Sequence, residues 1–429
     1  MNNPVRTPMI PTAACIVGMR ATQESVAQAT FRWSMQYRLY SSEQTARQLA
    51  VVIATFSLRC APQDRPIAAE QYQLIGRFLA LFFHFDEEVN PLPSERRGPY
   101  RAILDEILTG WPAAPSAAGA RTPPAPCARP LASTTDAPTP PERDPSMETG
   151  ARALRAFLTE LSGYGPPTAF IQAFRDYLGA VWEELDSTGV QLCGDALAEL
   201  YRLRSLLIAT QPYLRCWQVI LGSWPAAALT QVLDSAALEA RRHHPNTMLD
   251  RAVEIATRAH PQGATRQAPA LSEFEALAVV MTYLANDIGS QAKDQDSGEI
   301  NLVLLLSAQR AASNPAANPN TATADATLSL QKANESVRRM YNTAVARLRY
   351  LRNFLSQSDV MSGHPISLSA ANSYVSLITD IADGNLQGTR DLAALKADNE
   401  PDRRYVSKDL LDRLTMVKAS YTRNPTFEY

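Results

Sequence analysis

The sequence predicts an all-α protein, and three observations support this fold class. Apolar residues recur at intervals of three and four along most of the chain, as they do in helices with one buried face. The same segments are rich in Ala, Leu, Gln, Glu and Arg, which favour helices. Alternating β-branched runs joined by Asn-Gly or Asp-Gly turns, the usual signs of β-hairpins, are missing from the sequence.

The helical segments follow one another along nearly the whole chain. In the first part, the pattern predicts helices at Gln28–Leu39, Ser42–Ser57, Ala68–Phe85, Gly150–Ser162, Pro167–Asp186, Gly194–Ala209 and Tyr213–Leu221. In the second part, it predicts them at Leu271–Asp294, Ile300–Ala311, Leu328–Ser356 and Leu368–Ala382. We therefore expect a single helical bundle formed by residues 28–429, preceded by an N-terminal segment at residues 1–27.

Three irregular segments are expected to interrupt this bundle. Residues 111–147 contain many prolines and almost no large apolar side chains, so they cannot bury enough surface to offset their ordering entropy. We predict that they form a disordered loop. A second loop is predicted at residues 312–326. A third irregular stretch is predicted at residues 243–267, with a short helix at Met248–His260 within it.

Composition narrows the class of protein. The 429 residues carry a formal net charge of -2, which gives no reason to expect nucleic acid as a partner. The sequence has neither the start of a secretory signal nor the roughly 18 uncharged apolar residues of a membrane span. The five cysteines are scattered without a Cys-x-x-Cys pair, which argues against a disulfide framework and a zinc site. We therefore expect a cytoplasmic protein.

The first segment that suggests chemistry is an aromatic helix that ends in acidic residues. Asp86 and Asn90 are four residues apart, so they would share a helical face. Like charges at a helix C-terminus are unfavourable without a cation, and oxygen-rich clusters suit Mg²⁺. The competing interpretation is a solvated acidic helix end. The residues of this segment are Phe82, Phe83, Asp86, Glu87, Glu88 and Asn90.

The second segment carries a polar stripe. Asn286, Ser290 and Asp294 are spaced by four residues, so successive turns present an amide, a hydroxyl and a carboxylate on one helical face. Asn and Ser are weak helix formers, so their place directly after an apolar run needs a reason. Metal coordination supplies one, because all three side chains offer oxygen ligands. The competing interpretation is the polar face of an amphipathic helix.

These two segments resemble the metal-binding motifs of class I terpene synthases. The stretch from Asn286 to Asp294, NDIGSQAKD, resembles their NDxxSxxxE motif, and the stretch from Asp86 to Asn90, DEEVN, resembles their aspartate-rich motif. The DEEVN segment keeps only one aspartate of the family's DDxxD motif. The NDIGSQAKD segment ends in Asp instead of the family's Glu. Both changes preserve oxygen ligands. The resemblance extends from about Gln28 to Tyr405 and implies a helical bundle with a central active-site cavity.

The resemblance also implies roles for these residues in a Mg²⁺ site, with a trinuclear cluster expected and Mn²⁺ as an alternative metal. Asp86 would bridge metal ions on one side of the cavity mouth, with Asn90 or Glu87 assisting. On the opposite side, Asn286, Ser290 and Asp294 would chelate another ion. Lys293 would hydrogen-bond the diphosphate of the substrate.

Arginines that bind the diphosphate are implied as well. Arg204 is the favoured diphosphate sensor and Arg202 the alternative, and a helix break is expected within a few residues of it. Arg404 and Tyr405 match the pair that clamps diphosphate when the site closes, and they follow a Gly-Asn-Leu sequence at Gly384. For each arginine, an exposed solubilising charge is the competing interpretation.

The implied reaction is ionisation of farnesyl or geranylgeranyl diphosphate, followed by cyclisation of the cation and release of diphosphate. Aromatic faces would stabilise the cation. Two alternatives remain: a chain-elongating prenyltransferase, which would normally carry two DDxxD motifs, and a non-catalytic helical interaction protein. A homodimer is left open. The candidate lining residues, for which plain core packing competes, are Phe82, Phe83, Tyr201, Tyr283 and Trp217.

Overall fold

The computed structural model describes residues 13–89, 92–111, 145–186, 195–222, 227–259, 272–297, 301–313, 322–355 and 368–397. These residues form helices and no strand, which confirms the predicted all-α class. No helix among them is both long and apolar enough to span a membrane. Most of the loop predicted at residues 111–147 lies outside the described ranges.

The described helices fall into two consecutive groups along the chain. The first group is α1 (Ala13–Gln36), α2 (Glu43–Arg59), α3 (Ala69–His84), the π-helix η1 (Phe85–Val89), α4 (Ser94–Gly110), α5 (Pro145–Ser162) and α6 (Thr168–Asp186). The second is α7 (Ala196–Leu207), α8 (Thr210–Leu221), α9 (Ala227–His243), α10 (Thr247–Ala259), α11 (Glu273–Ser297), α12 (Leu302–Ala312), α13 (Ala322–Leu355) and α15 (Leu368–Ala397).

Every predicted helix is present, and the differences lie at the ends and in two additional helices. The helix predicted from Gln28 is α1, which begins at Ala13 and buries Val26 in the core, so the bundle includes part of the expected N-terminal segment. Similarly, α13 begins at Ala322, inside the predicted second loop. The short helix expected at Met248–His260 is α10. The sequence patterns did not predict α4 and α9.

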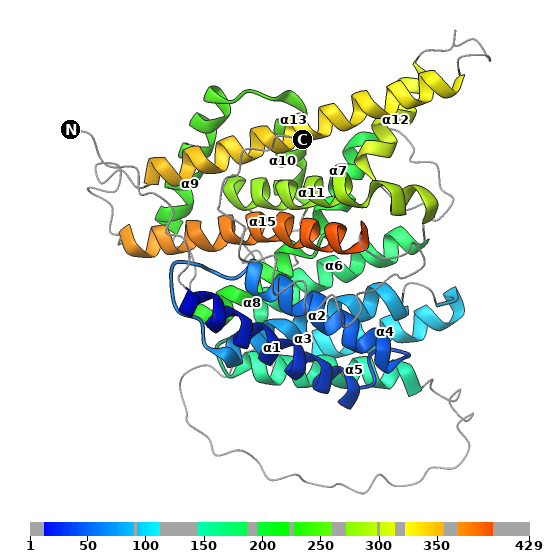
Figure 1. Cartoon of the computed structure of the whole chain (residues 1–429), viewed down its shortest axis with the longest axis vertical. Helices are drawn as coiled ribbons and strands as arrows, with labels where there is room; N and C mark the ends of the chain where they lie inside the picture. Colours follow the sequence, from blue (N-terminus) through cyan, green and yellow to red (C-terminus); the bar gives the residue numbers. More distant parts are fainter. Residues whose placement is uncertain are drawn as a thin grey trace, which may run out of the picture.

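Helix α11 lies at the centre of the bundle (Figure 1). It contacts α9, α10, α13 and α15, and also α7, α8 and α12. All residues from Phe274 to Ala285 are buried, although a surface helix would bury only one face. On the other side of the bundle, α1, α2 and α3 pack together, and α15 lies against α2.

Aromatic side chains fill the interface between α3 and its neighbours. The ring of Phe78 in α3 lies 5.5 Å from that of Phe170 and 6.2 Å from that of Phe174, both in α6. It also lies 6.1 Å from the ring of Tyr213 in α8. Rings at these separations pack favourably, which anchors α3 firmly just before the acidic segment.

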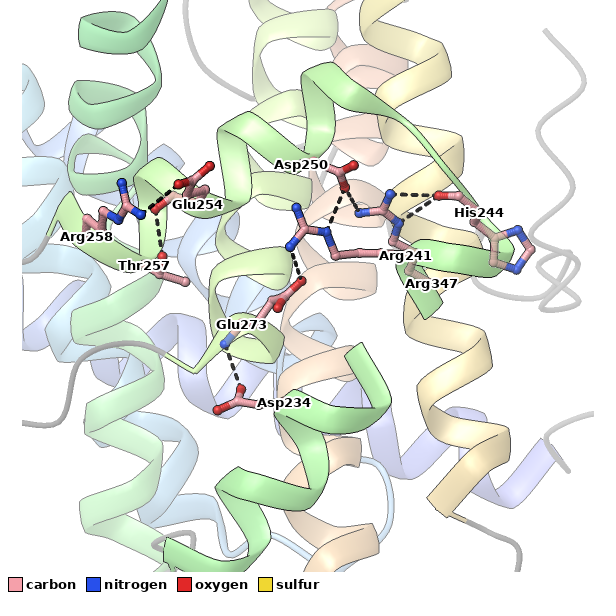
Figure 2. A network of polar contacts seen from close by, with 9 residues as sticks. All are labelled: Asp234, Arg241, His244, Asp250, Glu254, Thr257, Arg258, Glu273 and Arg347. Carbon is pink, nitrogen blue, oxygen red and sulfur yellow. Dashed lines mark hydrogen bonds and ion pairs between the residues drawn. The ribbon is translucent and has the colours of Figure 1, made fainter. Parts of the chain in front are cut away.

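A charged network fixes α9 and α10 to the rest of the bundle (Figure 2). The buried guanidinium of Arg347 in α13 pairs with Asp250 at 2.6 Å and donates to the carbonyl of His244 at 2.7 Å. Asp250 also binds Arg241 at 3.2 Å, and Arg241 reaches Glu273 of α11 at 3.4 Å. Four helices therefore meet at two arginines and two carboxylates.

Candidate active site

The predicted polar stripe lies on the C-terminal half of α11. The hydroxyl of Ser290 donates to Oδ2 of Asp294 over 2.5 Å, so these two side chains converge across one helical turn. Asp294 is only 3 % exposed, whereas Asn286 and Ser290 are half-buried. Asn286 stands one turn earlier on the same face. The structure therefore places the three predicted oxygen donors along one face of a central helix.

Asp287, to which the sequence patterns gave no role, is fully buried beside Asn286. It forms an ion pair with Arg204 of α7, and its Oδ2 accepts the backbone N–H of Leu302 at 2.9 Å. Burial raises the pKa of Asp287 to about 6, while Arg204 and the N–H of Leu302 oppose that rise. Helices α7, α11 and α12 thus meet at this carboxylate.

Arg204 and Arg202 have different surroundings. The side chain of Arg204 is 11 % exposed and faces Asp287. Burial acts to lower the pKa of Arg204, but Asp287, Asp294 and Glu184 together raise it above its ordinary value, so the guanidinium stays charged. Arg202 is more exposed and pairs with Glu183 and Glu199. Only Arg204 therefore lies beside the stripe of α11.

The helix break expected after Arg204 is present. Helix α7 ends at Leu207 and α8 begins at Thr210, and between them Ala209 has φ 52° and ψ 12°. This left-handed conformation is strained for a residue with a Cβ. The break redirects the chain into α8, in which every residue from Thr210 to Ile220 is buried.

The segment that carries Asp86 differs from the expected α-helix. Residues Phe85–Val89 form η1, a π-helix, in which the spacing of residues on one face is wider than four. The predicted shared face of Asp86 and Asn90 stays a prediction, because Asn90 lies outside the described residues. Asp86 is exposed, and the carboxylate of Glu88 accepts the backbone N–H of Ser41 at 2.9 Å.

Glu184 and Tyr177 of α6 interact electrostatically with predicted site residues. Burial raises the pKa of Tyr177 well above its ordinary value, and the carboxylates of Asp86 and Glu184 add to the rise. Glu184 also acts on Arg204. Asp86 and Glu184 are therefore both near Tyr177, and Glu184 is also near Arg204. The sequence patterns missed Glu184, because nothing in its local spacing marks it.

Three aromatic residues proposed to line the cavity are buried in the interior of the bundle. Tyr201, Tyr283 and Trp217 are fully buried. No hydrogen bond to the hydroxyl groups of Tyr201 and Tyr283 is found within the described ranges. The pKa of Tyr283 is raised well above its ordinary value by burial, with smaller contributions from Tyr201 and Asp287. The two phenols thus lie near each other, close to the Arg204–Asp287 pair.

The structure describes the side chains of only some of the remaining predicted site residues. The rings of Phe82 and Phe83 are half-buried and 5.3 Å apart, and Phe82 lies 5.6 Å from the ring of Tyr177. Lys293 belongs to α11, but its side chain is not among those described, and the same holds for Glu87 in η1. Arg404 and Tyr405 lie outside the described residues.

The donor set along α11 suits a hard cation. Within the described ranges, no group of three or more His, Cys, Asp or Glu side chains could hold a metal ion. A cation at the stripe would therefore rely on the amide oxygen of Asn286 and the hydroxyl of Ser290 besides the carboxylate of Asp294. Oxygen ligands of these types fit Mg²⁺, which binds few carboxylates and shares its remaining positions with water and phosphate.

Neither a protein-family model nor a curated protein sequence matches this chain. Solved structures do. Linalool/nerolidol synthase from Streptomyces clavuligerus, in complex with 2-fluorogeranyl diphosphate, matches with a TM-score of 0.50 and 14 % identity, covering 91 % of this chain and 98 % of that one. Hedycaryol synthase matches with a TM-score of 0.50 and 15 % identity, covering 91 % and 96 %. The likeness confirms the predicted helical bundle of the class I terpene synthase type.

Proposed function

We propose that this chain, which has the class I terpene synthase fold, ionises a linear isoprenyl diphosphate with Mg²⁺ and cyclises the resulting cation, releasing diphosphate. Farnesyl and geranylgeranyl diphosphate are the expected substrates. The observation that carries the proposal is the charged Arg204, which pairs with Asp287 on α11 and is near enough to Asp294 for that carboxylate to raise its pKa. A metal-bound diphosphate needs both kinds of group, cation and oxygen ligand, in one place.

The hydrogen bond within the stripe supports metal binding by Ser290. Because the hydroxyl proton points to Asp294, the lone pairs of the Ser290 oxygen remain available to a cation. Asn286 would add its amide oxygen from the preceding turn, and Asp86 would bind from η1. The Mg²⁺ ions would neutralise the charge that develops on the departing diphosphate.

Arg204 would hold the diphosphate itself. Its planar guanidinium can bind two phosphate oxygens at once, and the ion pair with buried Asp287 orients it before substrate arrives. Lys293, Arg404 and Tyr405 would contribute further hydrogen bonds. Diphosphate held in this way is a better leaving group, because its growing negative charge is met by fixed positive groups.

The interior below these groups would receive the prenyl chain. The rings of Phe82, Phe83, Tyr201, Tyr283 and Trp217 offer faces that stabilise carbocations. Their burial supports exclusion of bulk water, which would otherwise quench the cation before rings close.

The direct test is to incubate purified protein with geranyl, farnesyl and geranylgeranyl diphosphates plus Mg²⁺ and to analyse extracts by gas chromatography–mass spectrometry. Cyclic terpenes are the expected products. Longer prenyl diphosphates formed on addition of isopentenyl diphosphate would instead identify a chain-elongating enzyme. Intact substrates throughout would indicate a non-catalytic scaffold.

Substitution of the proposed ligands gives a second test. We expect Asn286→Ala and Asp86→Ala each to lower kcat/KM on the order of 100-fold or more, because each removes an oxygen that holds the charge-neutralising metal. The matched control is Asp105→Ala, which removes an exposed carboxylate in α4 and should leave turnover unchanged. Normal turnover in both ligand variants, measured on folded protein, would refute the site.

A further inference from the structure

We propose that Asn301 is a positioning residue for the metal site: its amide fixes the carboxylate of Asp294 in the orientation that binds the cation. This inference rests on the function proposed above. Asn301 lies directly before α12, on the segment that follows α11, and is 3 % exposed. None of the sequence motifs includes it.

Both the oxygen and the nitrogen of the Asn301 amide form hydrogen bonds. Its Oδ1 accepts the backbone N–H of Val303 at 2.9 Å, so the side chain caps the N-terminus of α12. Its Nδ2 donates to Oδ2 of Asp294 at 2.7 Å and to the backbone carbonyl of Asp287 at 2.9 Å. The cap thereby fixes the amide, and the amide fixes the carboxylate.

Capping alone does not account for an asparagine at this position. Ser, Thr and Asp cap helices about as well as Asn. An aspartate would place a second carboxylate against buried Asp294, and a serine side chain is too short to cap α12 and reach Asp294 together. Asn301 accepts with one atom of its amide and donates with the other, which both interactions need.

The two hydrogen bonds to Asp294 determine which oxygen can meet a metal ion. Oδ2 accepts from Ser290 and from Asn301. In the part of the chain that the structure describes, no hydrogen bond to Oδ1 is found. Oδ1 would therefore be the oxygen available to a cation. Groups that orient a metal ligand in this way typically contribute a factor of about 10–100 to metal affinity.

The test is Asn301→Ser, which keeps a capping side chain but removes the amide donor. The matched control is Asn246→Ser, because Asn246 caps α10 through the N–H of Leu249 at 3.1 Å while its amide donates to Thr343 instead of a proposed ligand. Binding of Mn²⁺ in the presence of inorganic diphosphate is followed by the electron paramagnetic resonance signal of the free ion. The half-saturating Mg²⁺ concentration for diphosphate release and the thermal unfolding midpoint are measured alongside.

We expect Asn301→Ser to weaken Mn²⁺ binding by about 10–100-fold and to raise the half-saturating Mg²⁺ concentration by a similar factor. Asn246→Ser should change neither quantity while lowering the unfolding midpoint to a comparable extent. In an Asp294→Asn background, Asn301→Ser should have no further effect on Mn²⁺ binding, because the carboxylate through which it acts is gone. If the serine variant folds poorly, Asn301→Thr provides the same comparison.

Wild-type Mn²⁺ affinity in folded Asn301→Ser or Asn301→Thr would overturn the inference and leave the proposed function standing. Equal loss of affinity in Asn246→Ser would overturn it as well, since the effect would then follow from stability alone. If the wild-type protein itself binds no Mn²⁺ with diphosphate and releases none from isoprenyl substrates, both the inference and the proposed function fail.

Discussion

Arg202 and Arg204 of α7 have partners of different burial, so their substitution should affect stability to different extents. Arg204→Ala strands the fully buried carboxylate of Asp287, so we expect it to lower the free energy of unfolding by about 3–5 kcal/mol. Arg202→Ala removes a partly exposed pair with Glu183 and Glu199, and we expect a cost below about 1 kcal/mol. Denaturant unfolding of the two variants measures the difference.

A double variant separates lost charge pairing from lost packing. Arg204→Met combined with Asp287→Leu removes both buried charges and should recover most of the stability that Arg204→Ala loses. Equal stability of Arg204→Ala and Arg202→Ala would mean that the Asp287 pair is solvated in solution.

Burial also determines the reactivity of the described thiols. It raises the pKa of Cys60, with Arg59 opposing and Asp380 adding to the rise, and it raises the pKa of Cys216 well above its ordinary value. A raised pKa means less thiolate at pH 8 than in a free cysteine, and the thiolate is the reactive form. We expect neither residue to react with Ellman's reagent at pH 8 until denaturant is added, as checked by peptide mapping. Prompt labelling of either in the folded protein would contradict this.

Among single residues, the sequence predicted those contacts that join polar side chains four residues apart on one helix. The convergence of Ser290 and Asp294 follows from the four-residue interval between them. The roles of Asp287, Glu184 and Asn301 could not be read in the same way, because each depends on a partner from another helix. For Asn301 the sequence holds one weak indication: asparagine is a good N-cap residue, and it lies directly before the apolar run that forms α12.

Among the elements, the break between α7 and α8 offers a clear test. Ala209 is buried and left-handed there, so its Cβ is strained. We expect Ala209→Gly to raise the free energy of unfolding by about 0.5–1 kcal/mol, and Ala209→Val to lower it by at least about 1 kcal/mol, since a β-branched residue tolerates positive φ least. Thermal or urea unfolding distinguishes the pair. Equal effects of both substitutions would mean that the break relaxes in solution.

Two elements show why periodicity alone was insufficient. Gly98 and Pro99 ordinarily discourage a helix, yet α4 continues through both because Tyr100, Leu104 and Leu108 pack into the core. At η1 the pattern of Asp86 and Asn90 suits an α-helix, whereas the chain widens there to a π-helix. Tertiary packing accounts for α4, and the local apolar pattern predicts neither that helix nor the π-helix at η1.

For the whole molecule, the close approach of α15 to α2 is a sensitive point. A Cβ added to Gly384 would overlap the backbone carbonyl of Arg59, which cannot move without disturbing α2. We expect Gly384→Ala to lower the free energy of unfolding by about 1–3 kcal/mol. The matched control is Gly179→Ala in α6, where a Cβ meets nothing within 4 Å.

In the control, alanine should raise the free energy of unfolding by about 0.5–1 kcal/mol, because it replaces glycine in an exposed helix interior. Opposite signs for the two substitutions, measured by the same unfolding assay, are the expected result. A neutral Gly384→Ala would show that α15 does not hold this position against α2 in solution.

The helical class and most helix positions were predictable because each helix carries its own periodic apolar face. The order in which the helices pack was not, since contacts such as Gly384 with Arg59 join residues that are far apart in the sequence. The central place of α11 has a visible signal, the nearly unbroken apolar run from Ala276 to Ala285, which suits a helix surrounded on all sides.

The hydrogen bond from Ser41 to Glu88 gives the short turn between α1 and α2 an unexpected importance. Through this hydrogen bond, the turn holds the segment that contains Asp86, which lies two residues before Glu88. Lengthening the turn by even one residue would weaken this hydrogen bond without changing any of the proposed site residues. Variation in the length of this turn would therefore shift the segment that carries Asp86, and homologues that differ in turn length there should differ in how they hold this proposed metal ligand.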